Sequence, residues 1–142
     1  MVAALDIGTD PQVVEFDRTQ CVDLLGTVRV ARVVLSVGCI PFALPVNMTV
    51  HDGDVIFATD GGSKVTSSVY GQVVSVEADE IDLASHRGWS ILVTGIAQRV
   101  TRPAELDCAS PLLQAWVSEP QPMLVKVPST LISGRWLLWG DR

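Results

Sequence analysis

A short loop at residues 57–64, FATDGGSK, contains residue types that can hold a phosphate group. An apolar segment ends at Thr59, two glycines follow, and Ser63 and Lys64 open a segment that suits a helix. Glycines let the backbone approach an anion closely, a helix N-terminus offers unpaired N–H groups, and a lysine adds positive charge. The same residues also fit a turn followed by a capped helix with a solvated lysine. The loop alone leaves both interpretations open.

Other familiar catalytic patterns do not occur in the sequence, which has no G-x-S-x-G, H-E-x-x-H, C-x-x-C or Walker motif. His51 and His86 lie beside expected turns and are interpreted as solvated loop residues. Cys21, Cys39 and Cys108 have no metal-ligand spacing, so we expect reduced cytosolic thiols and no metal site. Catalytic residues stay unknown, and any chemistry would depend on a bound cofactor.

Composition indicates one domain covering residues 1–142, with residues 1–16 expected to be loosely ordered. Apolar residues make up 48% of the chain and charged residues 18%, which suits a packed core. The mean hydropathy of +0.36 fits either apolar surface covered by a partner or cofactor, or a valine-rich core. A net charge of −6 offers no field for nucleic acid or an anionic membrane. No segment resembles a secretory signal or a membrane span, so we expect a cytoplasmic protein.

The first half of the chain predicts a short helix and a three-stranded meander. Asp17 and Gln20 have capping-box spacing for a helix over 18–25, which Gly26 would end. The segments TVRVARVVLSV, IPFALPVNMTV and VIFAT are rich in β-branched or apolar residues. A glycine-cysteine pair separates the first two segments, and the Asp-Gly pair at 52–53 predicts a tight hairpin between the last two.

The second half predicts a helix over 63–70, strands over 73–81 and 89–100, another helix, and one or two final strands after residue 122. Gly95 indicates a bulge or bend, and a break or kink is expected at Pro111 in the helix that begins near 101–103. The acidic run over 79–82 is interpreted as a solvated turn. Five to seven short strands with helices at the edges predict a small antiparallel barrel.

Three motifs in a fixed order connect these elements to a known family. LLGTVRVARVVLSV precedes PFALPVNMTVHDGDVIFATDGGSK, and RGWSILVTGIAQRV follows. This succession, over about residues 21–105 with a weaker match in ISGRW, resembles the pyridoxamine 5′-phosphate oxidase-like superfamily of FMN-binding split β-barrels. The resemblance is greatest to its short actinobacterial-type members and its nitroimidazole-resistance-like branch. It implies a mainly β fold with a six- to seven-stranded antiparallel split β-barrel and a few peripheral helices.

The resemblance also implies which residues contact FMN. One strand lies along the isoalloxazine ring, the end of the next contacts the ribityl-phosphate arm, a Ser-Lys pair binds the phosphate, and another strand approaches the flavin from the side. The strand along the ring matches Leu44, Pro45, Val46 and Asn47, and the contact to the ribityl-phosphate arm matches Thr59. The phosphate-binding pair matches Ser63 and Lys64, and the strand beside the flavin matches Trp89 and Ser90. With this context, phosphate binding becomes the favoured interpretation of the loop.

Members of the superfamily bind the flavin at a homodimer interface, which implies that a second chain completes the site. The implied function is FMN-dependent oxidation or reduction of a small molecule, with redox chemistry at flavin N5. Alternatives are a carrier of flavin, deazaflavin or haem without turnover, and a dimeric interaction protein that has lost its cofactor. The C-terminal sequence GRWLLWGDR lacks the Arg-His feature of true pyridoxamine-phosphate oxidases, which argues against that substrate.

Several residues keep two interpretations. Asn47 can bond the flavin or satisfy a strand end, and Trp89 can contact the cofactor or fill the core. Trp136 and Trp139 are interpreted as interface or core residues. The arginines that face either the site or solvent are Arg29, Arg32 and Arg135.

Overall fold

Nine strands of one antiparallel sheet form most of the described chain, which comprises residues 12–59, 67–113 and 123–138 of a computed structural model. The strands are β1 (Gln12–Glu15), β2 (Val30–Val37), β3 (Ile40–His51), β4 (Asp54–Thr59), β5 (Val73–Asp82), β6 (Arg87–Ile96), β7 (Gln98–Arg99), β8 (Met123–Val127) and β9 (Leu131–Leu138). The helices are α1 (Arg18–Leu25) and α3 (Pro103–Leu113). Across the sheet the strand order is β1-β9-β6-β5-β2-β3-β4-β8-β7.

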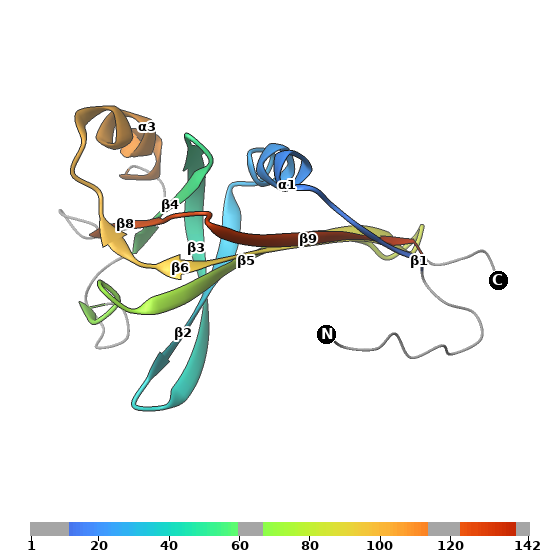
Figure 1. The fold of residues 1–142 in the computed structure, drawn as a ribbon, viewed down its shortest axis with the longest axis horizontal. Helices are drawn as coiled ribbons and strands as arrows, with labels where there is room; N and C mark the ends of the chain where they lie inside the picture. Colours follow the sequence, from blue (N-terminus) through green and yellow to red (C-terminus); the bar gives the residue numbers. More distant parts are fainter. Residues whose placement is uncertain (1–11, 60–66, 114–122, 139–142) are drawn as a thin grey trace.

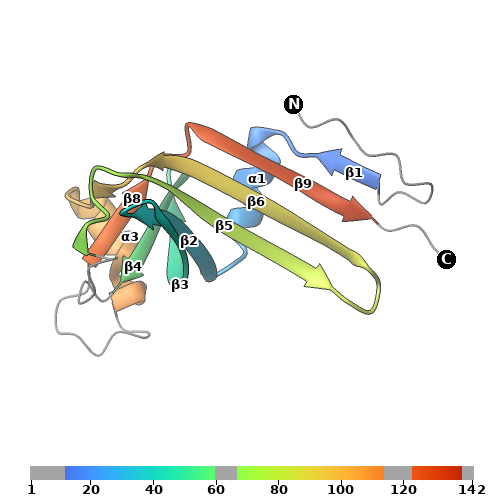
Figure 2. The same cartoon turned by 90° about the horizontal axis from the view of Figure 1, so that it is seen from below.

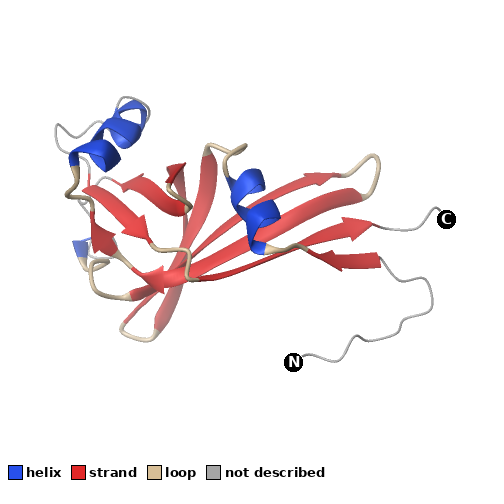
Figure 3. Ribbon diagram, turned by 45° about the horizontal axis from the view of Figure 1, so that its top comes forward, coloured by secondary structure: helices blue, strands red, loops and turns tan. Residues whose placement is uncertain are grey.

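The sheet curls into a half-barrel at one end and continues as a long ribbon at the other (Figures 1 and 2). Strands β5, β6 and β9 form the ribbon, and β1 pairs with the outer edge of β9. Figure 3 shows α1 against the long strands and α3 at the far end of the molecule. Neither of these helices is long and apolar enough to cross a membrane.

This architecture confirms the mainly β, split-barrel prediction, with two strands more than expected. The additional strands are the edge strands β1 and β7, which contain four and two residues. Runs this short carry too little hydrophobic alternation to be recognised in a sequence.

Local signals placed α1 and the first turns correctly. The Asp17 Oδ1 atom accepts a hydrogen bond from the Gln20 backbone N–H at 2.8 Å, and the Asp17 N–H donates to Gln20 Oε1 at 2.9 Å. The helix ends before Gly26, which has right-handed rather than left-handed geometry. Asp52 and Gly53 both have positive φ, at 49° and 80°, as a type I′ hairpin requires.

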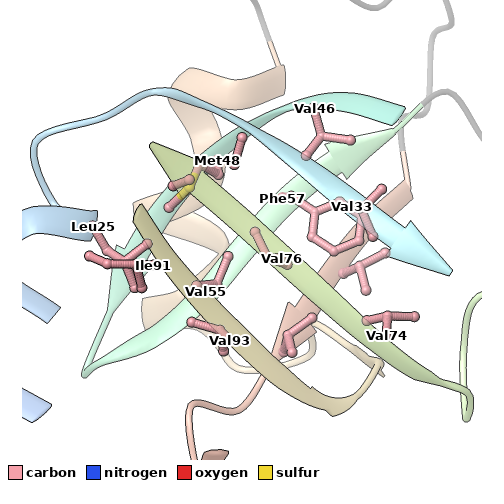
Figure 4. Close-up of a cluster of buried hydrophobic side chains, with 14 of the residues drawn as sticks. Leu25, Val33, Val46, Met48, Val55, Phe57, Val74, Val76, Ile91 and Val93 are labelled. Atoms are coloured by element: carbon pink, nitrogen blue, oxygen red, sulfur yellow. The ribbon is translucent and has the colours of Figure 1, made fainter. Parts of the chain in front are cut away.

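A single core fills the inner face of the curled sheet (Figure 4). Alternate residues of β2 point inward, so that Ala31, Val33 and Leu35 are buried while their neighbours are exposed. We call the opposite side of the sheet the outer face. Under α3, this outer face is covered by a smaller apolar cluster consisting of Ile56, Ala58, Ala109 and Leu112.

Three local predictions need correction. The acidic run over 79–82 is the end of strand β5 rather than a turn. Of the break or kink predicted at Pro111, the break is wrong, because helix α3 continues through Pro111 to Leu113. Of the bulge or bend predicted at Gly95, the bulge is wrong, because the register between β5 and β6 is regular from Val73↔Ile96 onward. Instead, Gly95 allows a close approach, because a Cβ atom there would lie 2.7 Å from the Pro128 carbonyl oxygen.

Candidate functional site

Residues 44–47 lie on β3 at the point where its neighbour β4 ends. Pairing with β2 covers Ile40 to Asn47, whereas pairing with β4 begins only at Asn47, opposite Ala58. Within the described residues, the β4 side of Leu44–Val46 is therefore an open strand edge. Backbone groups that point to such an edge are available to a ligand. Because the Met48 N–H donates to Arg29 on the β2 side, Val46 and Leu44 also bond toward β2, and Pro45 between them faces the open edge.

The side chains of these four residues alternate between the two faces of the sheet. Leu44 packs against the core and Val46 is buried, so both belong to the inner face. Pro45 and Asn47 belong to the outer face, where Asn47 is nevertheless only 8% exposed. A flat ring could contact the side chains of one pair only, so contact with all four positions requires the backbone edge.

Thr59 is the last residue of β4 and lies beside this open edge. It is 9% exposed and pairs with Met123 of β8. The chain leaves β4 here and enters the predicted phosphate loop. Ser63 and Lys64 of that loop lie outside the described residues, as do Trp116, Trp139 and the first half, residues 63–66, of the helix predicted over 63–70.

Trp89 and Ser90 lie on β6, away from the open edge. Strands β5 and β2 separate β6 from β3, so the two groups are three strand spacings, or about 14 Å, apart as measured along the curled sheet. The Trp89 side chain is 4% exposed and packs in the core, opposite Trp136 of β9. Ser90 points to the outer face, opposite Asp79 and Arg135. Within one chain, Thr59 therefore lies beside residues 44–47, whereas two strands separate residues 89–90 from them.

Arg32 belongs to a charged cluster that was not recognised in the sequence. Its guanidinium lies 3.6 Å from the Glu77 carboxylate and 3.7 Å from that of Asp79. Burial, followed by the hydrogen bond and charge of Asp79, raises the pKa of Glu77 to about 7, although Arg32 acts against this. The carboxyl group can therefore exchange a proton near neutral pH. Only the β2–β5 register, which sets Arg32 opposite Glu77, could have revealed the cluster.

The other arginines and histidines take simpler positions. Arg29 is exposed just before β2, and its carbonyl oxygen accepts a hydrogen bond from the Met48 N–H at 2.9 Å. His51 ends β3 with Nε2 3.4 Å from Asp52, and His86 lies in the exposed turn between β5 and β6. In the described part of the chain, no three His, Cys, Asp or Glu side chains gather as metal ligands.

A buried ion pair attaches α3 to the sheet. Glu105 Oε1 accepts a hydrogen bond from Lys126 Nζ at 2.7 Å and lies 3.7 Å from Arg102 Nε. This lysine is the main reason that the pKa of Glu105 lies below its usual value. The other carboxylate oxygen, Oε2, is buried and has no hydrogen-bond partner among the described residues. We interpret the pair as a structural contact, because it lies on the far side of β4 from the open edge.

A curled antiparallel sheet with one open inner edge defines the split β-barrel class of proteins, and this structure has that architecture. The sequence pattern of the pyridoxamine 5′-phosphate oxidase family matches residues 17–136. The chain therefore belongs to this family, as its motifs predicted.

Two relatives share enough sequence to support this assignment. An uncharacterized protein from Mycobacterium tuberculosis is 36% identical over 128 residues, covering 87% of this chain and 84% of the relative. The structure of an FAD binding protein from Mycobacterium smegmatis has 30% identity and a TM-score of 0.69, covering 88% of this chain and 98% of that one. An FAD and heme binding protein from the same organism has a TM-score of 0.70 at 15% identity, covering 90% of this chain and 76% of that one, which shows a likeness of fold.

Proposed function

We propose that this protein binds FMN along the open edge of β3 and uses it to oxidise or reduce a small molecule. The observation that carries this proposal is the unpaired edge at Leu44–Val46, which lies directly beside Thr59. The similar protein from Mycobacterium smegmatis is an FAD binding protein, which supports a flavin as the ligand. A bound flavin would supply hydride exchange at N5, while the protein binds and orients it.

Each part of the edge has a different role in this proposal. Leu44 and Val46 bond to β2 through their backbone groups, so at the open edge between them the group offered to the ring is the Pro45 carbonyl oxygen. The Asn47 amide, at the point where β4 pairing begins, supplies one further donor and acceptor. Because Leu44 and Val46 are packed in the core, they hold the edge rigid.

For the phosphate group, we propose Thr59, Ser63 and Lys64. Lys64→Ala should weaken FMN binding, because a hydrogen bond to a charged group contributes about 1.5–3 kcal/mol, or roughly 10- to 100-fold in Kd. Fluorescence quenching of the flavin would measure this affinity. Riboflavin is the matched control, since it lacks the phosphate and should bind both proteins equally. Unchanged FMN affinity would remove Lys64 from the site.

We further propose a homodimer in which Trp89 and Ser90 of one chain complete the site of the other. Their separation from the β3 edge within one chain supports this arrangement. Apolar side chains on the outer face give a second chain a surface to cover: Val34, Val73, Ile96 and Leu131 are all exposed in the single chain. Sedimentation equilibrium would test the dimer, and a monomer at micromolar concentration would contradict it.

A carrier protein without turnover is the second candidate, with flavin, deazaflavin or haem as cargo. The likeness of fold to an FAD and heme binding protein favours keeping haem in the comparison. Absorption spectra after adding FMN, deazaflavin or haem would identify the ligand. Reduction of bound flavin by NAD(P)H or another donor faster than free flavin would distinguish an enzyme from a carrier. We place the protein in the cytoplasm, since Cys21, Cys39 and Cys108 are free thiols.

A further inference from the structure

A second candidate site lies on the outer face of the ribbon, away from the β3 edge. It is a hollow of about 680 Å³ formed by β5, β6 and β9 with the end of β1. Its polar lining residues are Glu15, Glu77, Ser90, Ser133 and Arg135. Its apolar lining includes Leu92 on the outer face, and Phe16 and Ile132, which also pack against the core.

Strand register places the charges within this hollow. Arg135 lies opposite Ser90 on one side and Glu15 on the other. One step along the ribbon, Ser133 lies opposite Leu92, which lies opposite Glu77. Arg135 is exposed and has no carboxylate of the described residues within ion-pair distance, unlike Arg32. Arg135 therefore lines the hollow together with Ser90 and Ser133, and it forms no ion pair with Glu15 or Glu77, the two carboxylate residues there.

We propose that this hollow binds a small organic carboxylate with an apolar body, anchored by Arg135 with Ser90 and Ser133. A guanidinium binds a carboxylate in a bidentate geometry, and neighbouring hydroxyl groups can donate to the same oxygens. Leu92 is 40% exposed and offers an apolar wall for the rest of the molecule. The hollow shares Ser90 with the flavin contact proposed across the dimer, whereas Arg135, Ser133 and Leu92 are not among the residues proposed for flavin.

The charges around the hollow make binding depend on pH. Glu77 is faced by Asp79 on its own strand, Arg32 on β2, and Arg135 and Glu15 beyond β6. Because the pKa of Glu77 is about 7, this group is mostly protonated at pH 6 and can donate a hydrogen bond to an anion. At pH 8 it is charged and repels the same anion. Glu15 is exposed to solvent and its repulsion is screened at both pH values.

Benzoate is a suitable probe, because it combines a carboxylate with one apolar ring. Titration of the full-length protein, followed by amide chemical shifts in NMR, should move the signals of Ser90, Leu92, Ser133 and Arg135. We expect tighter binding at pH 6 than at pH 8. Benzyl alcohol and benzylamine, which have the same ring without the anion, should bind more weakly.

Three variants separate the proposed contacts. Arg135→Gln should lower benzoate affinity roughly tenfold or more, as expected for loss of a charged hydrogen-bonding partner. Arg87→Gln removes an exposed arginine at the start of β6, outside the hollow, and should leave the affinity unchanged. Glu77→Gln should bind equally at pH 6 and pH 8.

Several outcomes would overturn the proposal. These are shifts confined to other surfaces, a preference for benzylamine, and equal benzoate affinity of Arg135→Gln and the unchanged protein. If Arg135→Gln instead converts a dimer to a monomer in sedimentation without a change in benzoate binding, the hollow is covered by a second copy of the chain. Because Ser90 belongs to both proposed sites, Arg135→Gln distinguishes them: it should lower benzoate affinity and leave FMN affinity unchanged.

Discussion

Replacing Glu77 with glutamine should make the protein more stable above pH 7 and less dependent on pH. Burial and the neighbouring Asp79 raise the pKa of Glu77 from 4.5 to about 7 in the folded chain. Between these values the folded state holds a proton that the unfolded state has released. The free energy of unfolding therefore falls as pH rises from about 4.5 to about 7. Glutamine keeps the size and hydrogen-bonding capacity of the protonated acid but cannot become charged.

The structure limits the size of this effect. A pKa change from 4.5 to about 7 corresponds to roughly 3 kcal/mol at most. The Glu77 side chain is 27% exposed, and Arg32 lies 3.6 Å away with 59% exposure, so solvent screens these charges. We therefore expect Glu77→Gln to gain about 1–2 kcal/mol over the unchanged protein at pH 8. At pH 4.5 the two proteins should be equally stable, because the acid is then protonated in the folded state.

Urea denaturation at pH 5, 6, 7 and 8 would measure these free energies. The control is Glu80→Gln, since Glu80 is exposed on the same strand and its loss should leave the pH profile unchanged. The reasoning is refuted if Glu77→Gln keeps the slope of the unchanged protein. It is also refuted if the variant is less stable at pH 8, because attraction between charged Glu77 and Arg32 would then exceed the cost of burial.

Two further predictions concern packing and can be checked by denaturation at pH 7. Lys126→Met should lower the free energy of unfolding by about 3 kcal/mol, because it leaves the buried Glu105 carboxylate without its main partner. Combining Lys126→Met with Glu105→Gln should recover much of the lost stability. A Lys126→Met variant as stable as the unchanged protein would contradict the pairing. Gly134→Ala should cost about 1–3 kcal/mol, because its Cβ would lie 2.7 Å from Cys21 Sγ of α1. Gly26→Ala, where the nearest atom is 3.4 Å away, should be tolerated, and equal effects of the two substitutions would refute the packing argument.

Features determined by neighbouring residues could be predicted from the sequence. The capping box of Asp17 and Gln20 and the type I′ turn at Asp52 and Gly53 each depend on contacts within four residues. Such contacts form whatever the rest of the chain does, so their sequence signals are direct. The succession of short strands then predicted a small antiparallel barrel, and the family resemblance specified its split form.

Features determined by distant residues could not be predicted in the same way. Arg32 and Glu77 are far apart in the sequence, and their ion pair exists only because β2 and β5 are neighbours in the sheet. The acidic residues after Glu77 looked like a solvated turn, since charge runs are depleted in strands. They remain in strand β5 because pairing with β6 continues to Asp82, beyond the half-barrel and into the ribbon.

Strand order also decides how the candidate flavin site can be assembled. In sequence, the segments around Asn47 and Ser90 both belong to motifs of one family, which suggests a single contiguous patch. The fold inserts β2 and β5 between them, so a ligand on the open edge of β3 does not reach β6 of the same chain without spanning about 14 Å of sheet. A second chain that brings its own β6 to that edge would let both motifs contact one flavin without the ligand following the sheet. The separation therefore supports the proposed dimer, while the β3 edge and Thr59 are the part of the proposed site that lies together within one chain.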